Sequence, residues 1–230
     1  GYKARYSNTT GYTNIANGYQ TLYSNTTGRN NVANSTDALY SNISGNGNVA
    51  NGTRALLSNT TGNQNIAVGV IALFSNTTGN QNIANGYQAL YSNTTGHSNI
   101  AFGVSSGYNL TTGNANIIFG QNVNAPSATG SGQLNIGNLI YGTGVYDSTT
   151  TPSSVPTAGK IGIGVQDATQ KLEVNGGVRL NTTTARPTAD ATSQGTFWVV
   201  KGDGSTTADT VQICLMSATG TYSWVTLATG

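Results

Sequence analysis

The sequence predicts an all-β protein: a parallel β-roll, or β-solenoid, of stacked 17-residue coils, followed by a small all-β domain. A glycine returns every seventeen residues from Gly11 to Gly130, and nearly the same sequence surrounds each of these glycines. The composition agrees, because 31 of the 230 residues are glycine and only 7% are charged, against about 25% charged residues in an ordinary domain. A fixed period of this length is typical of proteins in which each repeat packs on the next.

Every repeat carries the same columns of side chains. An asparagine stands three residues after the glycine, and Ile or Val and then a small residue follow it, as in Asn82, Ile83 and Ala84. A second glycine, an Ala-Leu pair and an aromatic residue or Leu complete the unit. We expect the asparagines to form a ladder of side-chain amides along the stack. They are Asn14, Asn31, Asn48, Asn65, Asn82, Asn99 and Asn116.

Each apolar run of the repeat is two or three residues long, too short for an amphipathic helix, and the Asn, Thr and Gly between the runs favour turns. We therefore expect two short strands in each coil, the second at the Ala-Leu pair, for example Ala89-Leu90. Within the stack, each Ile should lie on the Ile of the next coil at the strand spacing of roughly 4.8 Å.

A coil of seventeen residues encloses little apolar volume, so we expect several chains to share a common interior. The aromatic column of the repeat is a candidate for the seam between chains, and a surface stripe of scattered rings is the alternative. This column comprises Tyr23, Tyr40, Leu57, Phe74, Tyr91 and Tyr108.

The pattern Asn-Ile-Ala-x-Gly, followed by Ala-Leu-x-Ser-Asn-Thr-Thr-Gly, resembles the head repeats of trimeric autotransporter adhesins, although those repeats are somewhat shorter. It is still more similar to repeats in phage tail fibres and phage-derived injection machines. The resemblance implies a homotrimer of left-handed parallel β-rolls. A second stretch, at 171–181 with Arg186-Pro187 and 195–198, resembles the distal ends of phage tail-fibre proteins and implies a trimeric tip.

Composition divides the chain into four parts: the repeat shaft at 1–142, a linker or crossover at 143–159, a short β connector at 160–185, and a β tip domain at 186–230. The repeats decay from Gly96 onwards, as terminal capping coils do, and we interpret Asn135-Ile136-Gly137 as a last coil displaced by two residues. Because the chain opens within a repeat, we expect it to be the C-terminal piece of a longer protein.

Alternating apolar residues and turn signals predict the strands beyond the shaft. In the connector we expect strands at 160–165, 171–174 and 178–180, with a turn at 175–177. In the tip domain we expect strands at 196–200, 210–216 and 222–227, with a turn at 201–205.

The shaft has few residues suited to catalysis. Cleavage of glycosidic bonds requires two carboxylates a few ångströms apart, and Asp37 is the one acidic residue between 11 and 142. We interpret Asp37 as a solvated surface charge and His97, which replaces Asn or Gln in a variable column, as a solvent-facing residue. We therefore predict no catalytic residue, and the protein is not expected to be an enzyme.

Known cofactor and metal motifs are also incomplete. Asp203, Ser205 and Asp209 lack the spacing of a calcium loop, and Gly159-Lys160 lacks the rest of a phosphate loop. Cys214 lies in an apolar run and is expected to be a small core residue. We predict no metal site and no cofactor.

One further column consists of asparagines that begin Asn-x-Ser/Thr sequences. In a bacterial or phage protein we expect them to be turn residues, whereas a eukaryotic host would make them candidate glycan acceptors. They are Asn25, Asn42, Asn59, Asn76 and Asn93.

These features predict the structural and receptor-binding distal part of a trimeric tail fibre, of a phage or of a phage-like contractile injection system, which attaches the particle to a cell surface. Trp198, Trp224, Phe197 and Tyr222 are candidate receptor contacts in the tip, and the alternative is that they fill its core. The alternative function is a cellular trimeric adhesin or surface filament that binds matrix or glycan through the repeat face.

The expected partners are two further copies of the chain, a cell-surface receptor such as a glycan, and an upstream fibre or baseplate protein. The expected location is extracellular, on the particle. A net charge of +2 without a basic stripe argues against a nucleic-acid partner. No apolar run is long enough for a transmembrane helix, so we predict no membrane insertion.

Overall fold

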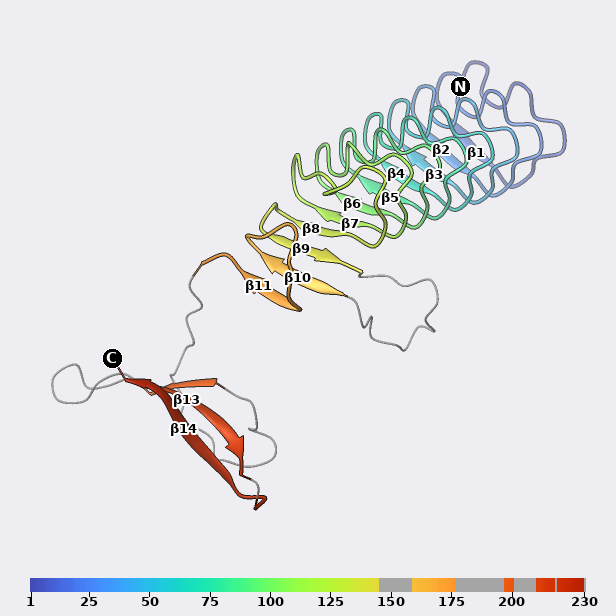
Figure 1. The fold of residues 1–230 in the computed structure, drawn as a ribbon. Helices are drawn as coiled ribbons and strands as arrows, with labels where there is room; N and C mark the ends of the chain where they lie inside the picture. The colour runs from blue at the N-terminus through green and yellow to red at the C-terminus, as the bar shows by residue number, and fades with distance from the viewer. Residues whose placement is uncertain (145–158, 177–196, 201–209, 218, 230) are drawn as a thin grey trace. The chain divides into compact units, whose positions relative to one another are not determined.

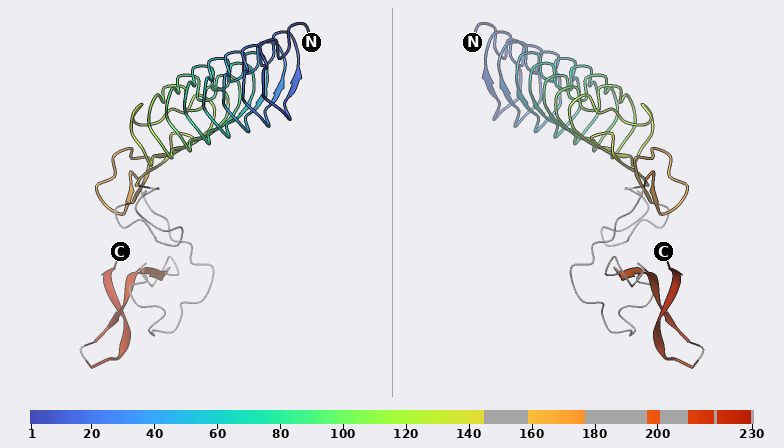
Figure 2. Two further views of the ribbon diagram at one scale, coloured as in Figure 1. Left: turned by 90° about the vertical axis from the view of Figure 1, so that its right-hand side faces the viewer. Right: turned by 90° about the vertical axis from the view of Figure 1, so that its left-hand side faces the viewer.

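The computed structural model describes residues 1–144, 159–176, 197–200, 210–217 and 219–229, and these residues contain strands and turns but no helix (Figure 1). The chain divides into two units, Gly1–Gly176 and Gly177–Gly230. The first unit is a stack of coils whose strands form one sheet (Figures 1 and 2). The predicted all-β repeat fold is therefore confirmed.

Each coil of the first unit contributes one short strand, and consecutive strands pair in parallel. The register repeats every seventeen residues; for example, Ile66 pairs with Ile83 and Ala67 with Ala84. The strands are β1 (Ile15–Asn17), β2 (Val32–Asn34), β3 (Val49–Asn51), β4 (Ile66–Val68), β5 (Ile83–Asn85), β6 (Ile100–Phe102), β7 (Ile117–Phe119) and β8 (Leu134–Ile136).

The prediction that the last coil is displaced by two residues was wrong. Leu134 pairs with Ile117, and Asn135 pairs with Ile118, so β8 keeps the common register. Leu134 and Asn135 simply replace the Ile and the small residue of the earlier coils, because backbone hydrogen bonding between strands does not depend on side-chain identity.

Three further strands extend this sheet. β9 (Ile140–Thr143) runs antiparallel to both β8 and β10 (Lys160–Ile163), and β11 (Leu172–Val174) runs parallel to β10. Just before β11, the backbone N–H and the hydroxyl of Thr169 donate to the Glu173 carboxylate at 2.6 and 2.9 Å. These hydrogen bonds stabilise the charged form and lower the pKa of the Glu173 carboxyl.

The second unit holds an antiparallel sheet in the order β12 (Phe197–Val200), β13 (Thr210–Met216) and β14 (Tyr222–Thr229). All three strands lie where the sequence predicted them, as do β10 and β11 in the first unit. The strand expected at 178–180, the turn expected at 201–205 and most of the expected linker lie outside the described residues.

The second strand expected in each coil is not formed. The Ala-Leu pair lies in a turn, and its leucine adopts the left-handed conformation, with φ of 51° at Leu90 and 53° at Leu39. Both side chains of the pair are fully buried, as at Ala38 and Leu39. A strand would send one of the two outwards, because successive side chains of a strand alternate between its faces.

Each Ile does lie on the Ile of the next coil, as Ile66 lies on Ile83, but this column faces outwards and not into the interior. In β2 to β6 the central alanine points into the coil and is buried, while its neighbours point outwards. Ile66 retains 39% of its exposed surface and Ile15 retains 58%. The interior is built instead from small strand residues and the turn leucines, because a narrow coil accommodates alanine opposite leucine. These leucines are Leu22, Leu39, Leu56, Leu73 and Leu90.

The two coils after Gly96 show how the interior stays filled when the pattern changes. Gly107 takes the place of the core leucine, and one coil later Ile118 takes the place of the core alanine. A Cβ on Gly107 would lie 2.9 Å from Cδ2 of Leu90 and 3.7 Å from Cγ1 of Ile118, so both side chains pack where the turn side chain is missing. The exchange conserves core volume.

Two columns of buried asparagines link the coils. The first is the predicted column: the side-chain amide of Asn65 donates to Asn48 Oδ1 at 3.1 Å and to the Gly79 carbonyl at 2.8 Å. The second contains Asn76, whose amide donates to Asn59 Oδ1 at 2.8 Å and to the same Gly79 carbonyl at 3.1 Å. From Gly28 to Gly96, the carbonyl of the repeat glycine is thus a shared acceptor for both ladders.

The ladders end where the sequence changes. Gln133 terminates the first, and its amide nitrogen donates to Asn116 Oδ1 and to the carbonyls of Ser127 and Gly130. Leu110 terminates the second and leaves Asn93 Oδ1 without a hydrogen-bond partner in the described part of the chain. The Asn-x-Ser/Thr asparagines therefore belong to a buried structural ladder and do more than shape turns.

We expect Asn65→Ala to lower the free energy of unfolding by roughly 3–5 kcal/mol, because the backbone N–H and the side-chain amide of Asn82 lose their buried acceptor. Asn80→Ala is the matched control: its side chain accepts the same pair of bonds, from Asn63, at a part-exposed position where water can replace it. The control should cost about 1 kcal/mol or less. Chemical denaturation at fixed protein concentration measures both losses, and equal losses would contradict a special role for the buried ladder.

We expect Gly79→Ala to lower the free energy of unfolding by about 3 kcal/mol or more, because a Cβ would overlap with Asn76 Oδ1 and the Gly96 carbonyl. Gly47→Ala should cost less, about 1–2 kcal/mol, which is the strain of a side chain at the Gly47 φ of +66°. Its added Cβ would meet Gln64 Cγ at an ordinary 3.6 Å. Melting temperatures followed by circular dichroism compare the two, and a larger loss at Gly47 would show that backbone strain matters more than the ladder.

Candidate functional site

The structure brings together two of the four aromatic residues that the sequence proposed as receptor contacts. Tyr222 and Trp224 are two residues apart on β14, so they share one face of the sheet, and both are half-buried. Trp224 pairs with Cys214 and Tyr222 with Met216 across the β13–β14 ladder. This face offers aromatic and thioether surface beside a buried thiol.

The other two aromatic residues lie on β12, where Phe197 pairs with Ile213 and Trp198 with Gln212. Their side chains are outside the described part of the structure. Cys214 is fully buried, which confirms the expectation that it is a small core residue. The second unit thus carries a candidate contact surface whose described members are Tyr222 and Trp224.

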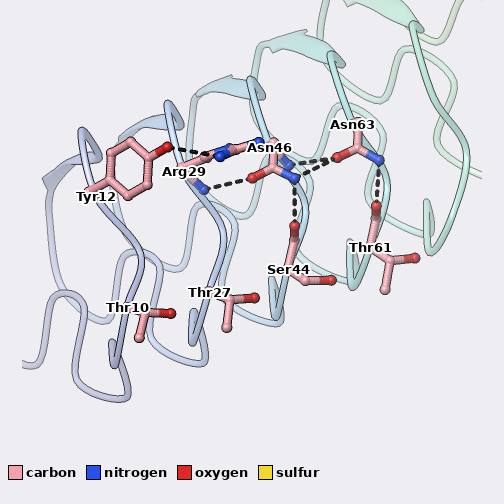
Figure 3. Close-up of a pocket in the computed structure, with 8 residues that line it drawn as sticks. All are labelled: Thr10, Tyr12, Thr27, Arg29, Ser44, Asn46, Thr61 and Asn63. Atoms are coloured by element: carbon pink, nitrogen blue, oxygen red, sulfur yellow. Dashed lines mark hydrogen bonds between the residues drawn. The ribbon is translucent and has the colours of Figure 1, made fainter.

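A groove on the shaft is the better-defined site, and it was not predicted from the sequence. It has a volume of about 620 Å³, and residues of neighbouring coils line it (Figure 3). One wall is a row of hydroxyl side chains, one from each coil. The other wall contains the residues that directly follow the repeat glycines. The lining residues are Thr10, Thr27, Ser44 and Thr61, with Tyr12, Arg29, Asn46 and Asn63.

Hydrogen bonds between coils hold the second wall rigid. The backbone N–H of Arg29 donates to Asn46 Oδ1 at 3.0 Å, and the backbone N–H of Asn46 donates to Asn63 Oδ1 at 2.9 Å. Each asparagine amide also donates to a backbone carbonyl of its own coil, Asn46 to Ser44 and Asn63 to Thr61, at 2.9 Å. These amides are already used within the protein, so they are scaffold rather than ligand contacts.

The hydroxyl wall is free for a ligand. The hydroxyls of Thr10, Thr27, Ser44 and Thr61 make no hydrogen bond within the described part of the chain. A threonine precedes three of them and behaves differently: Thr26 Oγ1, for example, donates to the carbonyl of Ile43 at 3.1 Å. Of these two adjacent columns, the first therefore stabilises the stack and the second exposes its hydroxyls to solvent.

Arg29 and Tyr12 stand at one end of the groove. The guanidinium of Arg29 donates from Nη1 to the Tyr12 hydroxyl at 2.8 Å, and its central carbon lies 5.7 Å from the centre of the tyrosine ring. The ion pair found among the described residues joins Arg54 Nε to Asp37 Oδ2 at 3.6 Å, and neither residue lines the groove. Arg29 is thus a positive charge without an acidic partner in that part of the chain.

The structure places His97 and Asp37 away from any candidate chemistry. His97 is exposed, as expected, and its backbone N–H donates to Asn114 Oδ1 at 2.9 Å. Asp37 is not simply a solvated charge: its side chain is 18% exposed and pairs with Arg54 of the next coil. The described residues contain no group of three His, Cys, Asp or Glu that could hold a metal ion.

Sequence reasoning missed the groove because its asparagines and threonines look like ordinary repeat positions. The available signal was Tyr12 and Arg29, which begin a column that continues with Asn46, Asn63, Asn80, His97 and Asn114. Which of two neighbouring threonines faces the groove depends on the turn geometry, and only the folded coil shows it.

Comparisons of the chain with protein-family models, curated proteins and solved structures give no match. Among the described residues, no helix is long and apolar enough to cross a membrane.

Proposed function

We propose that this chain is the structural and receptor-binding distal part of a homotrimeric tail fibre, of a phage or a phage-like contractile injection system, exposed on the outside of the particle. The observation that carries the proposal is the uninterrupted in-register stack from β1 to β8, in which two buried amide ladders link each coil to the next. Such a stack suits a rod that holds an attachment surface away from a particle.

The outer face of the sheet supports assembly from several chains. The Ile column forms a continuous apolar strip along the stack, and at its C-terminal end Phe102 and Phe119 stack beside it with ring centres 5.2 Å apart. Exposed apolar strips of this kind mark interaction surfaces. We call these residues the sheet strip: Ile66, Ile83, Ile100, Ile117 and Leu134, with Phe102, Phe119 and Ile136.

A further copy of the same chain is the partner that fits the sheet strip. Its side chains recur at the strand spacing of about 4.8 Å, and a surface with that same repeat can match them over many coils. The strip contains no charged residue, so copies placed side by side do not repel one another. The aromatic column, the other candidate seam, already stacks along its own chain, with Tyr91 and Tyr108 5.1 Å apart.

The composition of the strip favours parallel chains. The residue that ends each strand is Asn17, Asn34 and Asn51 in β1 to β3, but Phe102 and Phe119 in β6 and β7. Parallel copies place apolar ends against apolar ends, whereas antiparallel copies place phenylalanines against asparagine amides. Parallel chains also present their second units at the same end, which allows several weak receptor contacts to act together.

The groove on the shaft favours a second candidate function. A cellular trimeric adhesin or surface filament would bind matrix or glycan through the repeat face, and the groove lies on that face. The two candidates share the proposed assembly and differ in whether the shaft or the second unit makes the main contact.

We expect the purified chain to have a native mass near three times 23.5 kDa. The double variant Ile100→Asp with Ile117→Asp should reduce this mass to that of a single chain, because charges in the sheet strip would be buried unpaired. Thr112→Asp, at an exposed hydroxyl position between them, should leave the mass unchanged. Light scattering after size exclusion measures the native mass of the wild type and of both variants, and circular dichroism checks that each is folded. A monomeric wild type would overturn the proposed trimer.

Attachment is expected to depend on the second unit. Fluorescently labelled protein should be retained on a subset of a panel of bacterial cells, and Trp224→Ala with Tyr222→Ala should reduce the retained fraction about tenfold or more, as for aromatic hot spots. Leu227→Ala, a more exposed residue on β14, is the control. Unchanged retention in the double variant would place the receptor contact elsewhere on the chain.

A further inference from the structure

We infer that the groove on the shaft binds an acidic glycan laid along the stack of coils, with a sugar carboxylate at Arg29. The inference adds a ligand class and a second binding site to the proposed attachment function. It rests on that function only for the biological role of the binding. The groove uses the residues one and sixteen places after each repeat glycine, so it is separate from the sheet strip and from the second unit.

The row of free hydroxyls is the first part of the argument. Thr10, Thr27, Ser44 and Thr61 repeat once per coil along the groove (Figure 3), at the strand spacing of about 4.8 Å. Hydroxyls can donate and accept, as sugar hydroxyls do. Because successive rings of an extended glycan recur at a comparable distance, neighbouring sugars would each meet a hydroxyl of the same wall.

The unpaired guanidinium identifies the glycan as acidic. Arg29 uses one N–H toward Tyr12 and has no acidic partner in the described part of the chain, so most of its five donors face outwards unused. No acidic residue lines the groove. A guanidinium matches a carboxylate with two parallel hydrogen bonds, and in a polymer rich in hydroxyls the carboxylate belongs to a uronic or sialic acid.

Tyr12 supplies the remaining contact. Its side chain is 54% exposed, and its hydroxyl is held by Arg29, which restrains the ring at the end of the groove. A restrained tyrosine offers an apolar face to the C–H surface of a sugar ring at little cost in conformational entropy. The second wall is equally preorganised, because inter-coil hydrogen bonds fix Asn46 and Asn63.

The test uses the intact chain and isothermal titration calorimetry with four defined probes: oligogalacturonate, oligomannuronate, oligosialic acid, and methyl-esterified oligogalacturonate as the neutral match. We expect at least one acidic probe to bind and the neutral probe to bind more weakly. Arg29→Gln should weaken the binding about tenfold or more, which is the loss of affinity expected when a hydrogen bond between charged groups is removed. Thr27→Val with Thr61→Val should weaken it without changing the preference for acidic over neutral probe.

Arg54→Gln is the matched control, since it removes the same charge outside the groove and should leave the affinity unchanged. The inference is overturned if none of the acidic probes binds, or if Arg29→Gln and Arg54→Gln weaken binding equally, which would indicate a net-charge effect. Loss of binding in Trp224→Ala but not in Arg29→Gln would also overturn it, and would leave attachment through the second unit intact.

Discussion

The structure depends on one repeated interaction: from Gly45 to Gly96, the carbonyl of the repeat glycine accepts hydrogen bonds from two buried asparagine amides. At Gly79 these are Asn65 at 2.8 Å and Asn76 at 3.1 Å, from two separate ladders. Only glycine is tolerated there, because a Cβ would collide with Asn76 and with the next coil's carbonyl. Buried amides are costly unless they are fully bonded, so this arrangement also fixes how far one coil lies from the next.

This polar interior explains why the shaft has an apolar exterior. Two asparagines, two alanines and a leucine occupy the inside of a typical coil, with little space for another large side chain. Alternation along the three-residue strand then sends Ile and its partner outwards, as at Ile66 and Val68. The same geometry that makes a single coil stack stable therefore leaves the sheet strip available to other chains.

Much of the fold could be predicted because it follows from the repeat period and from local residue patterns. The 17-residue period, the ladder through Asn65, and the strands β10 to β14 follow from local patterns of glycine, asparagine and alternating apolar residues. The errors came from positions where two conformations suit the same residues. The Ala-Leu pair at Leu90 matches a strand pattern, although the folded coil holds this leucine in a left-handed turn. Asn76 suits an exposed turn as well as a buried ladder.

By itself, the sequence determined that near-identical coils stack in register, since a strict repeat requires each coil to bury what its neighbour buries. Only the tertiary structure decided which columns face inwards, because the turn at each Ala-Leu pair rotates the chain by an amount that no local pattern specifies. That rotation buries Asn76, leaves Ile83 half-buried on the outer face, and places Thr27 and Arg29 along one groove. The surfaces on which assembly and binding are proposed to depend are thus set by the path of the coil.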